Sequence, residues 1–83
     1  MIQAVLRYLV KNPDAKDTIE GIRRWWLPEE LRSVDKNTIE RSLGCLIRRG
    51  WLNARAMGST TKFYFLIREK MEEIKTYLED LEE

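Results

Sequence analysis

The chain of 83 residues has no histidine, one cysteine and only two prolines. Without histidine it has no Ser-His catalytic pair and no histidine-based metal site. A single cysteine supplies neither a structural zinc site nor an internal disulfide framework. A phosphate-binding loop and a glycine-rich dinucleotide fingerprint are also missing. We therefore expect a protein that is not an enzyme and that uses no metal or other cofactor.

Long apolar runs are missing as well, since none approaches the roughly 18 residues of a membrane span. The N-terminal stretch "MIQAVLRYLVKN" has neither the basic region nor the small-residue cleavage site of a secretory signal. The lone Cys45 fits a reducing compartment. We expect a cytoplasmic protein with no membrane partner. A chain of this length forms one small domain with little room for a small-molecule pocket.

The net charge of +1 conceals an uneven distribution. Residues 1–68 hold 13 Lys/Arg and 7 Asp/Glu, a balance of +6, whereas residues 69–83 hold 2 Lys and 7 Asp/Glu, a balance of −5. A basic body with an acidic end indicates a polyanion partner on one side of the molecule. The alternative is a terminal helix that is acidic only for solubility. We divide the chain into a domain over 1–68 and a C-terminal helix over 69–83.

Hydrophobic periodicity predicts a mainly α fold with a small β-hairpin, of the α+β class. Helices are expected at 2–11, from Asp17 to just before Pro28, at 35–49 and at 69–83. Asp17 has capping-box spacing to Glu20, and Asp35 is the expected N-cap of the third helix. The strands "LNARAM" and "TKFYFLI" flank the hairpin loop Gly58-Ser59-Thr60.

The third helix has one apolar and one cationic side. The apolar stripe comprises Ile39, Leu43, Leu46 and Ile47, which leaves an outward face of Asn37, Arg41, Gly44 and Arg48. A glycine inside a helix costs about 1 kcal/mol relative to alanine, so Gly44 needs a reason. Either it allows close approach to a phosphate or another backbone, or the helix packs tightly on its neighbours there.

The segment "DKNTIERSLGCLIRRGWLNAR", followed by "GSTTKFYFL", resembles the winged helix-turn-helix DNA-binding superfamily. The resemblance covers nearly the whole chain as an order of elements. It implies a three-helix core with a hairpin wing, and double-stranded DNA bound with the third helix in the major groove. Base contacts come from the start of such a helix, so the base-reading candidates are Lys36, Asn37 and Arg41. Expected contacts to the DNA backbone come from Arg23, Arg24, Arg32, Thr38, Arg48, Arg55 and Lys62. The wing tip is neutral, so we expect a modest contribution from it.

The last helix carries an apolar seam with spacings of 4, 3, 4 and 3, which is typical of a coiled coil or a helix pair. The seam consists of Ile67, Met71, Ile74, Leu78 and Leu81. It packs either in cis on the first helix or on its copy in a second chain. We favour the two-fold homodimer, which would read two half-sites about one DNA turn apart.

Two side chains are open to other interpretations. Trp25 is expected in the core or in an interface, because its neighbour Trp26 continues the apolar stripe of the second helix. Cys45 is interpreted as inert rather than as a redox sensor activated by a nearby arginine. The leading hypothesis is a small transcriptional regulator. The alternative is a winged helix that presents the third helix or Trp25 to a protein partner and binds no DNA.

Overall fold

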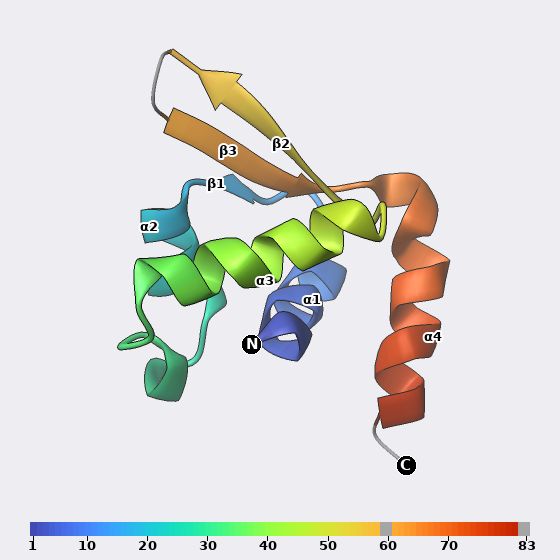
Figure 1. Ribbon diagram of the computed structural model, residues 1–83. Helices are drawn as coiled ribbons and strands as arrows, with labels where there is room; N and C mark the ends of the chain where they lie inside the picture. Colours follow the sequence, from blue (N-terminus) through green and yellow to red (C-terminus); the bar gives the residue numbers. More distant parts are fainter. Residues whose placement is uncertain (59–60, 82–83) are drawn as a thin grey trace.

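The computed structural model describes residues 1–58 and 61–81, and Figure 1 shows an α+β fold. Its helices surround a core that is closed on one side by a three-stranded antiparallel sheet. The coarse fold class predicted from the sequence is confirmed. In chain order the elements are α1 Ile2–Lys11, β1 Lys16–Asp17, α2 Ile19–Gly21, the π-helix η1 Ile22–Trp26, the 3₁₀ turn η2 Glu29–Leu31, α3 Lys36–Arg48, β2 Leu52–Met57, β3 Thr61–Leu66, the 3₁₀ turn η3 Arg68–Lys70 and α4 Met71–Leu81.

The sheet has the strand order β1-β3-β2, so β3 is the central strand. Successive side chains of a strand point to opposite faces. On β3, Tyr64 and Leu66 are buried toward the helices, whereas Phe63 and Phe65 lie on the outer face and are half-buried. Across the ladders Arg55 pairs with Phe63, and Lys16 pairs with Phe65. The outer face of the sheet therefore carries both aromatic and basic side chains.

The core is built from the apolar stripes of α1, α3 and α4 together with the inner face of the sheet. Figure 1 shows α3 running across the molecule between the sheet and α1. Removing these stripes from water is the main force that fixes α3 in place. The helices contribute the buried residues Val5, Leu6, Leu9, Ile22, Trp26, Ile39, Leu43, Leu46, Ile74 and Leu78.

The two ends of α3 are set by local chemistry. Asp35 accepts a hydrogen bond through Oδ1 from the backbone N–H of Thr38 at 2.8 Å, which confirms it as the N-cap. Gly50 has φ of 79°, a left-handed conformation that glycine adopts without strain. The Trp51 N–H then bonds back to the carbonyl of Leu46 at 3.1 Å, so the helix stops as predicted.

Three sequence predictions near the core are wrong in detail. The N-cap of α2 is Thr18, whose Oγ1 accepts from the Gly21 N–H, because Asp17 is already engaged in β1. Ile47 is 37% exposed, since it lies on the α3 flank next to the buried stripe rather than in it. Trp25 is 64% exposed in the single chain and so lies outside the core, because the adjacent Trp26 turns inward and stacks on Tyr8 with ring centroids 5.3 Å apart. The other part of the prediction, that Trp25 lies in an interface, stays a prediction.

Helix α4 packs in cis. Ile74 is fully buried and Leu78 is 7% exposed, both within the core of the single chain, where α4 contacts α1. The ring of Tyr77 lies edge-on to Trp51 at 5.2 Å. The prediction that Ile74 and Leu78 lie in a dimer interface is therefore wrong, because the chain itself already covers both side chains. Of the same seam, Ile67 and Met71 are half-buried and Leu81 is 44% exposed.

Across the described ranges, 1–58 and 61–81, no helix combines the length and apolar character needed to cross a bilayer.

Candidate nucleic-acid interface

The outward face of α3 presents polar and basic side chains to solvent. Asn37, Arg41 and Arg48 are all exposed, and they lie opposite the buried stripe of the helix. Within the described residues Arg41 and Arg48 form no ion pair, and the Asn37 side chain makes no hydrogen bond. The face is therefore cationic and keeps its donors available to a partner.

Electrostatics favour a charged cap at the start of this face. The backbone and side-chain hydrogen bonds from Thr38 lower the pKa of Asp35 from its ordinary value of 3.8. Desolvation opposes this lowering of the pKa, whereas the positive charges of Arg41 and Arg23 add to the lowering. Arg23 of η1 and Arg41 of α3 thus act on the same carboxylate, so the second helical segment brings a cation to the beginning of α3.

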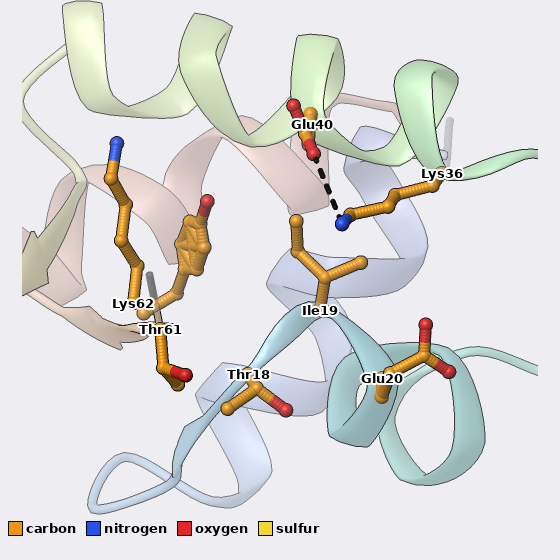
Figure 2. A pocket seen from close by; sticks show the side chains of 8 residues that line it. Thr18, Ile19, Glu20, Lys36, Glu40, Thr61 and Lys62 are labelled. Atoms are coloured by element: carbon orange, nitrogen blue, oxygen red, sulfur yellow. Dashed lines mark ion pairs between the residues drawn. The ribbon is translucent and has the colours of Figure 1, made fainter. Parts of the chain in front are cut away.

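Figure 2 shows the groove that separates α3 from the start of α2 and from the hairpin. Lys36 and Glu40 point into this groove from α3, and their charged atoms lie 4.0 Å apart. Lys62 extends toward α3 from the hairpin. The pKa of Tyr64, which also lines the groove, is raised by burial and by the negative charge of Glu40. Lys36 therefore lies on the groove-facing flank of α3, and Lys62 lines the same groove from the hairpin.

Gly44 is the one position of the outward face that has no side chain. A Cβ added there would meet no atom within 4 Å, so the alternative of tight packing against α1 or α2 is excluded. The described residues therefore leave open space over the helix at Gly44. Gly44 lies on the outward face together with Arg41 and Arg48, one helical turn from each.

The predicted backbone-contacting residues are distributed over several places. Thr38 is exposed on the far flank of α3 from the groove, and its carbonyl accepts from Ser42 Oγ at 3.0 Å. Arg48 is exposed near the end of the outward face, with Nη2 3.6 Å from Cys45 Sγ. It is this arginine that contacts Cys45, whereas the guanidinium of Arg49 lies over Trp51 at 4.4 Å.

The three arginines from η1 to the start of α3 differ in how many contacts their side chains make within the chain. Arg24 is exposed, and Arg32 donates through Nε to the carbonyl of Leu27, which ties it to the end of η1. Arg23 is half-buried, with Nη1 3.9 Å from Glu20 Oε1. Its Nε is buried and has no hydrogen-bond partner among the described residues. Of the three, only Arg24 has no ion pair or hydrogen bond with another described residue.

The two basic residues of the hairpin lie on opposite faces of the sheet, and only one of them is on the same side as α3. Lys62 belongs to the inner face and the groove, whereas Arg55 belongs to the outer face and lines a depression with Phe63. Arg55 is therefore separated from α3 by the thickness of the sheet. Ser59 and Thr60, of the predicted hairpin loop, lie outside the described residues.

The acidic helix lies away from the start of the basic face. Tyr77 contacts Trp51, so α4 is placed at the C-terminal end of α3, as Figure 1 also shows. At 1.5 Å per residue, α3 holds its first turn about 18 Å from that end. Among the described residues, the acids of α4 form ion pairs only with Lys70 and Lys75. The outward arginines of α3 are thus left uncovered.

One surface escaped the sequence-based reasoning. The outer sheet face, with Phe63 and Phe65, was treated only as strand-forming sequence, although strict alternation along "TKFYFL" could have placed both rings on one face. The exposed Trp25 lies in a depression with Tyr8 and Lys11 of α1. The apolar stripe of the second helix predicts which of the two adjacent tryptophans is buried, and the burial of Trp26 confirms it.

Comparisons of this chain with models of protein families, with curated proteins and with solved structures gave no match.

Proposed function

We propose that this protein is a winged-helix protein that binds double-stranded DNA through the outward face of α3 and acts as a small transcriptional regulator. The order of elements and the strand order β1-β3-β2 support the winged-helix part of the proposal. The observation that carries the DNA-binding part is the uncovered cationic face of α3, with exposed Arg41 and Arg48 on either side of Gly44.

In the proposed complex the outward face of α3 enters the major groove. Arg41 reads a guanine through paired hydrogen bonds to O6 and N7, and Asn37 reads an adenine in the same manner. Gly44 lets the helix axis come close to the groove floor, because no side chain projects there. Lys36 approaches from the flank beside the hairpin, where its pairing with Glu40 has to loosen before it reaches a base.

Affinity in this proposal comes mainly from phosphates. Each phosphate neutralised by a lysine or arginine releases counterions, which makes binding depend strongly on salt. Arg48, Arg24 and Lys62 are exposed and are the contacts that we assign to the DNA backbone. Arg32 and Arg55 are not assigned, since the first is tied to Leu27 and the second lies on the opposite face of the sheet.

The test is a salt titration of binding to random duplex DNA, followed by selection of a preferred site from a sequence pool. Arg41→Ala is expected to weaken binding to the selected site by about 1–3 kcal/mol and to relax its sequence preference. Lys75→Ala, on α4, is the matched control and should change neither. Duplex binding that is undetectable at low salt, or equal losses in the two variants, would refute the proposal.

The predicted homodimer has less surface than the sequence suggested. Ile74 and Leu78 are covered in cis, so a two-fold contact between α4 helices would rest on Leu81 and the exposed edges of Ile67 and Met71. Such a contact is expected to be weak. Sedimentation of the wild type over a range of concentrations tests it, with Leu81→Asp as the variant that should abolish any dimer.

A second candidate function is protein binding through Trp25, which the exposure of this side chain favours. The indole is 64% exposed and borders a depression of about 360 Å³ whose other apolar walls are Ala4, Leu27 and Pro28. Exposed aromatic side chains in such a setting are characteristic of interface anchors. Trp25→Ala separates the two functions, because it should leave duplex binding by α3 unchanged.

A further inference from the structure

The outer face of the sheet carries a second surface with the chemistry of a nucleic-acid site. Phe63 and Phe65 lie on this face two residues apart on the central strand, about 6.7 Å from one another along it. Both rings are half-buried, and they border a depression of about 390 Å³. No helix covers this side in Figure 1, where the sheet forms the edge of the molecule opposite α1.

Basic side chains flank the two rings. Arg55 is the cross-strand partner of Phe63 on β2, and Lys16 is the partner of Phe65 on β1. The Lys16 Nζ lies over the Phe65 ring, 5.7 Å from its centroid, so a base that stacks on this face of the ring must displace the amine. Lys16, Arg55, Phe63 and Phe65 line the depression, which contains no acidic residue. The surface is therefore both aromatic and positively charged.

We propose that this outer face binds single-stranded nucleic acid, with unpaired bases stacked on Phe63 and Phe65 and with Lys16 and Arg55 contacting the adjacent phosphates. Stacking platforms of this kind combine aromatic side chains with a positively charged path for the backbone. A duplex is a poor ligand for the face, because its bases are already stacked on each other. The inference is independent of the proposed function of α3, since the two surfaces lie on opposite sides of the sheet.

An acidic peptide would satisfy the two cations, but it would not use both ring faces. Nucleobases use each feature of the surface: their planar rings match the phenylalanines, and the phosphates match Lys16 and Arg55. Asn53, opposite Phe65 on β2, also lies on this face. Its Oδ1 accepts from the Ala54 N–H at 2.8 Å, which leaves Nδ2 as a donor to a base edge. The combination of rings, cations and an amide therefore favours a polynucleotide.

The experiment measures binding by fluorescence anisotropy with three labelled probes of about 12 units, a length within the range of known single-strand sites. The probes are oligothymidylate, oligouridylate and an abasic deoxyribose-phosphate strand of equal length and charge. We expect either oligonucleotide to bind at least about fivefold more tightly than the abasic strand, because only they have bases to stack. Oligodeoxyuridylate, which differs from oligouridylate only in the sugar, then identifies the sugar of the bound strand. Equal binding of the abasic strand would overturn the proposal, since charge alone would then explain it.

Substitutions locate the site. Phe63→Leu and Phe65→Leu keep an apolar side chain but remove the ring, and each is expected to weaken oligonucleotide binding by about 5- to 150-fold. Lys75→Ala on α4, outside both proposed surfaces, is the matched control, and it should leave oligonucleotide binding within about twofold. Circular dichroism of each variant verifies folding. Equal losses in Lys75→Ala and the phenylalanine variants, or no loss in the phenylalanine variants, would overturn the proposal.

A measurement on the unaltered chain covers the case in which a phenylalanine variant fails to fold. Amide chemical shifts followed during titration with the oligothymidylate should change over 53–55 and 63–65. Changes confined to α3, or no changes at all at a saturating probe concentration, would overturn the assignment of this face.

Discussion

Helices α3 and α4 both bury one apolar stripe, but their exposed faces carry opposite charges. Each buries an apolar stripe in the common core, Ile39, Leu43 and Leu46 in α3 and Ile74 and Leu78 in α4. On α3 the exposed face carries arginines that pair with no acid among the described residues. On α4 the exposed face is acidic, and Glu72 and Glu73 pair with lysines three residues away.

The difference teaches that the buried stripe places a helix, while the residues left outside decide what the helix can bind. Pairs three residues apart on one helix contribute only a few tenths of a kcal/mol, but they reduce the attraction of a charged face for a distant partner. The outward arginines of α3 have no such local compensation. In addition, α3 has a glycine at the centre of its exposed face, a position at which α4 has ordinary side chains.

The largest expected effect tests whether α4 is a structural helix, as its cis packing indicates. Leu78 is 7% exposed and belongs to the core, so Leu78→Ala should lower the free energy of unfolding by about 2–5 kcal/mol. Leu81, one turn on and 44% exposed, is the control, and Leu81→Ala should change it by less than about 0.5 kcal/mol. Urea denaturation followed by circular dichroism measures both.

If α4 instead served mainly to pair two chains, the outcome would differ. The stability of Leu78→Ala would then depend on protein concentration, and sedimentation would show a dimer in the wild type but not in the variant. Such a result would restore the dimer interface and would remove the contrast between α4 as a structural element and α3 as a binding element.

The sequence was informative where structure depends on neighbouring residues. The bounds of α1, the cap at Asp35 and the end at Gly50 were all predicted, because each depends on side chains within one turn. The burial of Trp26 was predicted as well, from the apolar stripe of the second helix, whereas the exposure of Ile47 was not, since it depends on where the neighbouring elements pack. The cis packing of α4 has the same cause: the apolar seam fits two partners equally well, and only the assembled core selects one.

For the candidate site, the helical period alone placed Asn37, Arg41 and Arg48 on one exposed face. It did not reveal that Lys36 pairs with Glu40 across the groove-facing flank. Nor did the linear sequence show that Arg55 and Lys62, close together in the hairpin, lie on opposite faces of the sheet. Strand register decides this, and it was available only from the ladder of β2 with β3.

A smaller effect concerns how the two helices begin. α3 starts at a carboxylate cap, whereas the turn Arg68–Lys70 that leads into α4 has no side-chain cap. Because hydrogen bonds from Thr38 lower the pKa of Asp35, its contribution to stability is complete above the ordinary value of 3.8 and is lost as the pH falls through the lowered pKa. Asp35→Ala should therefore lower Tm by a few degrees near neutral pH and by progressively less in acid.

Asp35→Asn is the matched control for this prediction. Asparagine is also a good N-cap but does not titrate, so the variant should keep most of the Tm and lose the acid-dependent part of the change. Thermal melts from about pH 2 to about pH 7 compare the three proteins. A difference between wild type and Asp35→Ala that stays constant over this range would show that the charge of the cap plays no part.

The smallest expected changes in stability come from alanine substitutions on the exposed faces of α3 and α4. Gly44 has open space around it, so Gly44→Ala should raise the free energy of unfolding by about 0.5–1 kcal/mol by reducing the freedom of the unfolded chain. On α4 the exposed Thr76 is the matched position, and Thr76→Ala should also stabilise the helix, by about 0.5 kcal/mol or less. Denaturation curves of the two variants should thus shift in the same direction.

Duplex DNA binding should distinguish these variants although their stabilities change alike. The methyl group of Gly44→Ala projects from the outward face between Arg41 and Arg48, so it should weaken duplex binding by holding α3 away from the groove floor, whereas Thr76→Ala should have no effect. A protein that gains stability and loses affinity through one methyl group retains its glycine for the sake of a partner. If Gly44→Ala binds duplex as tightly as the wild type, close approach at this position is not the reason for the glycine, and the contrast between a binding helix and a structural helix loses its most specific support.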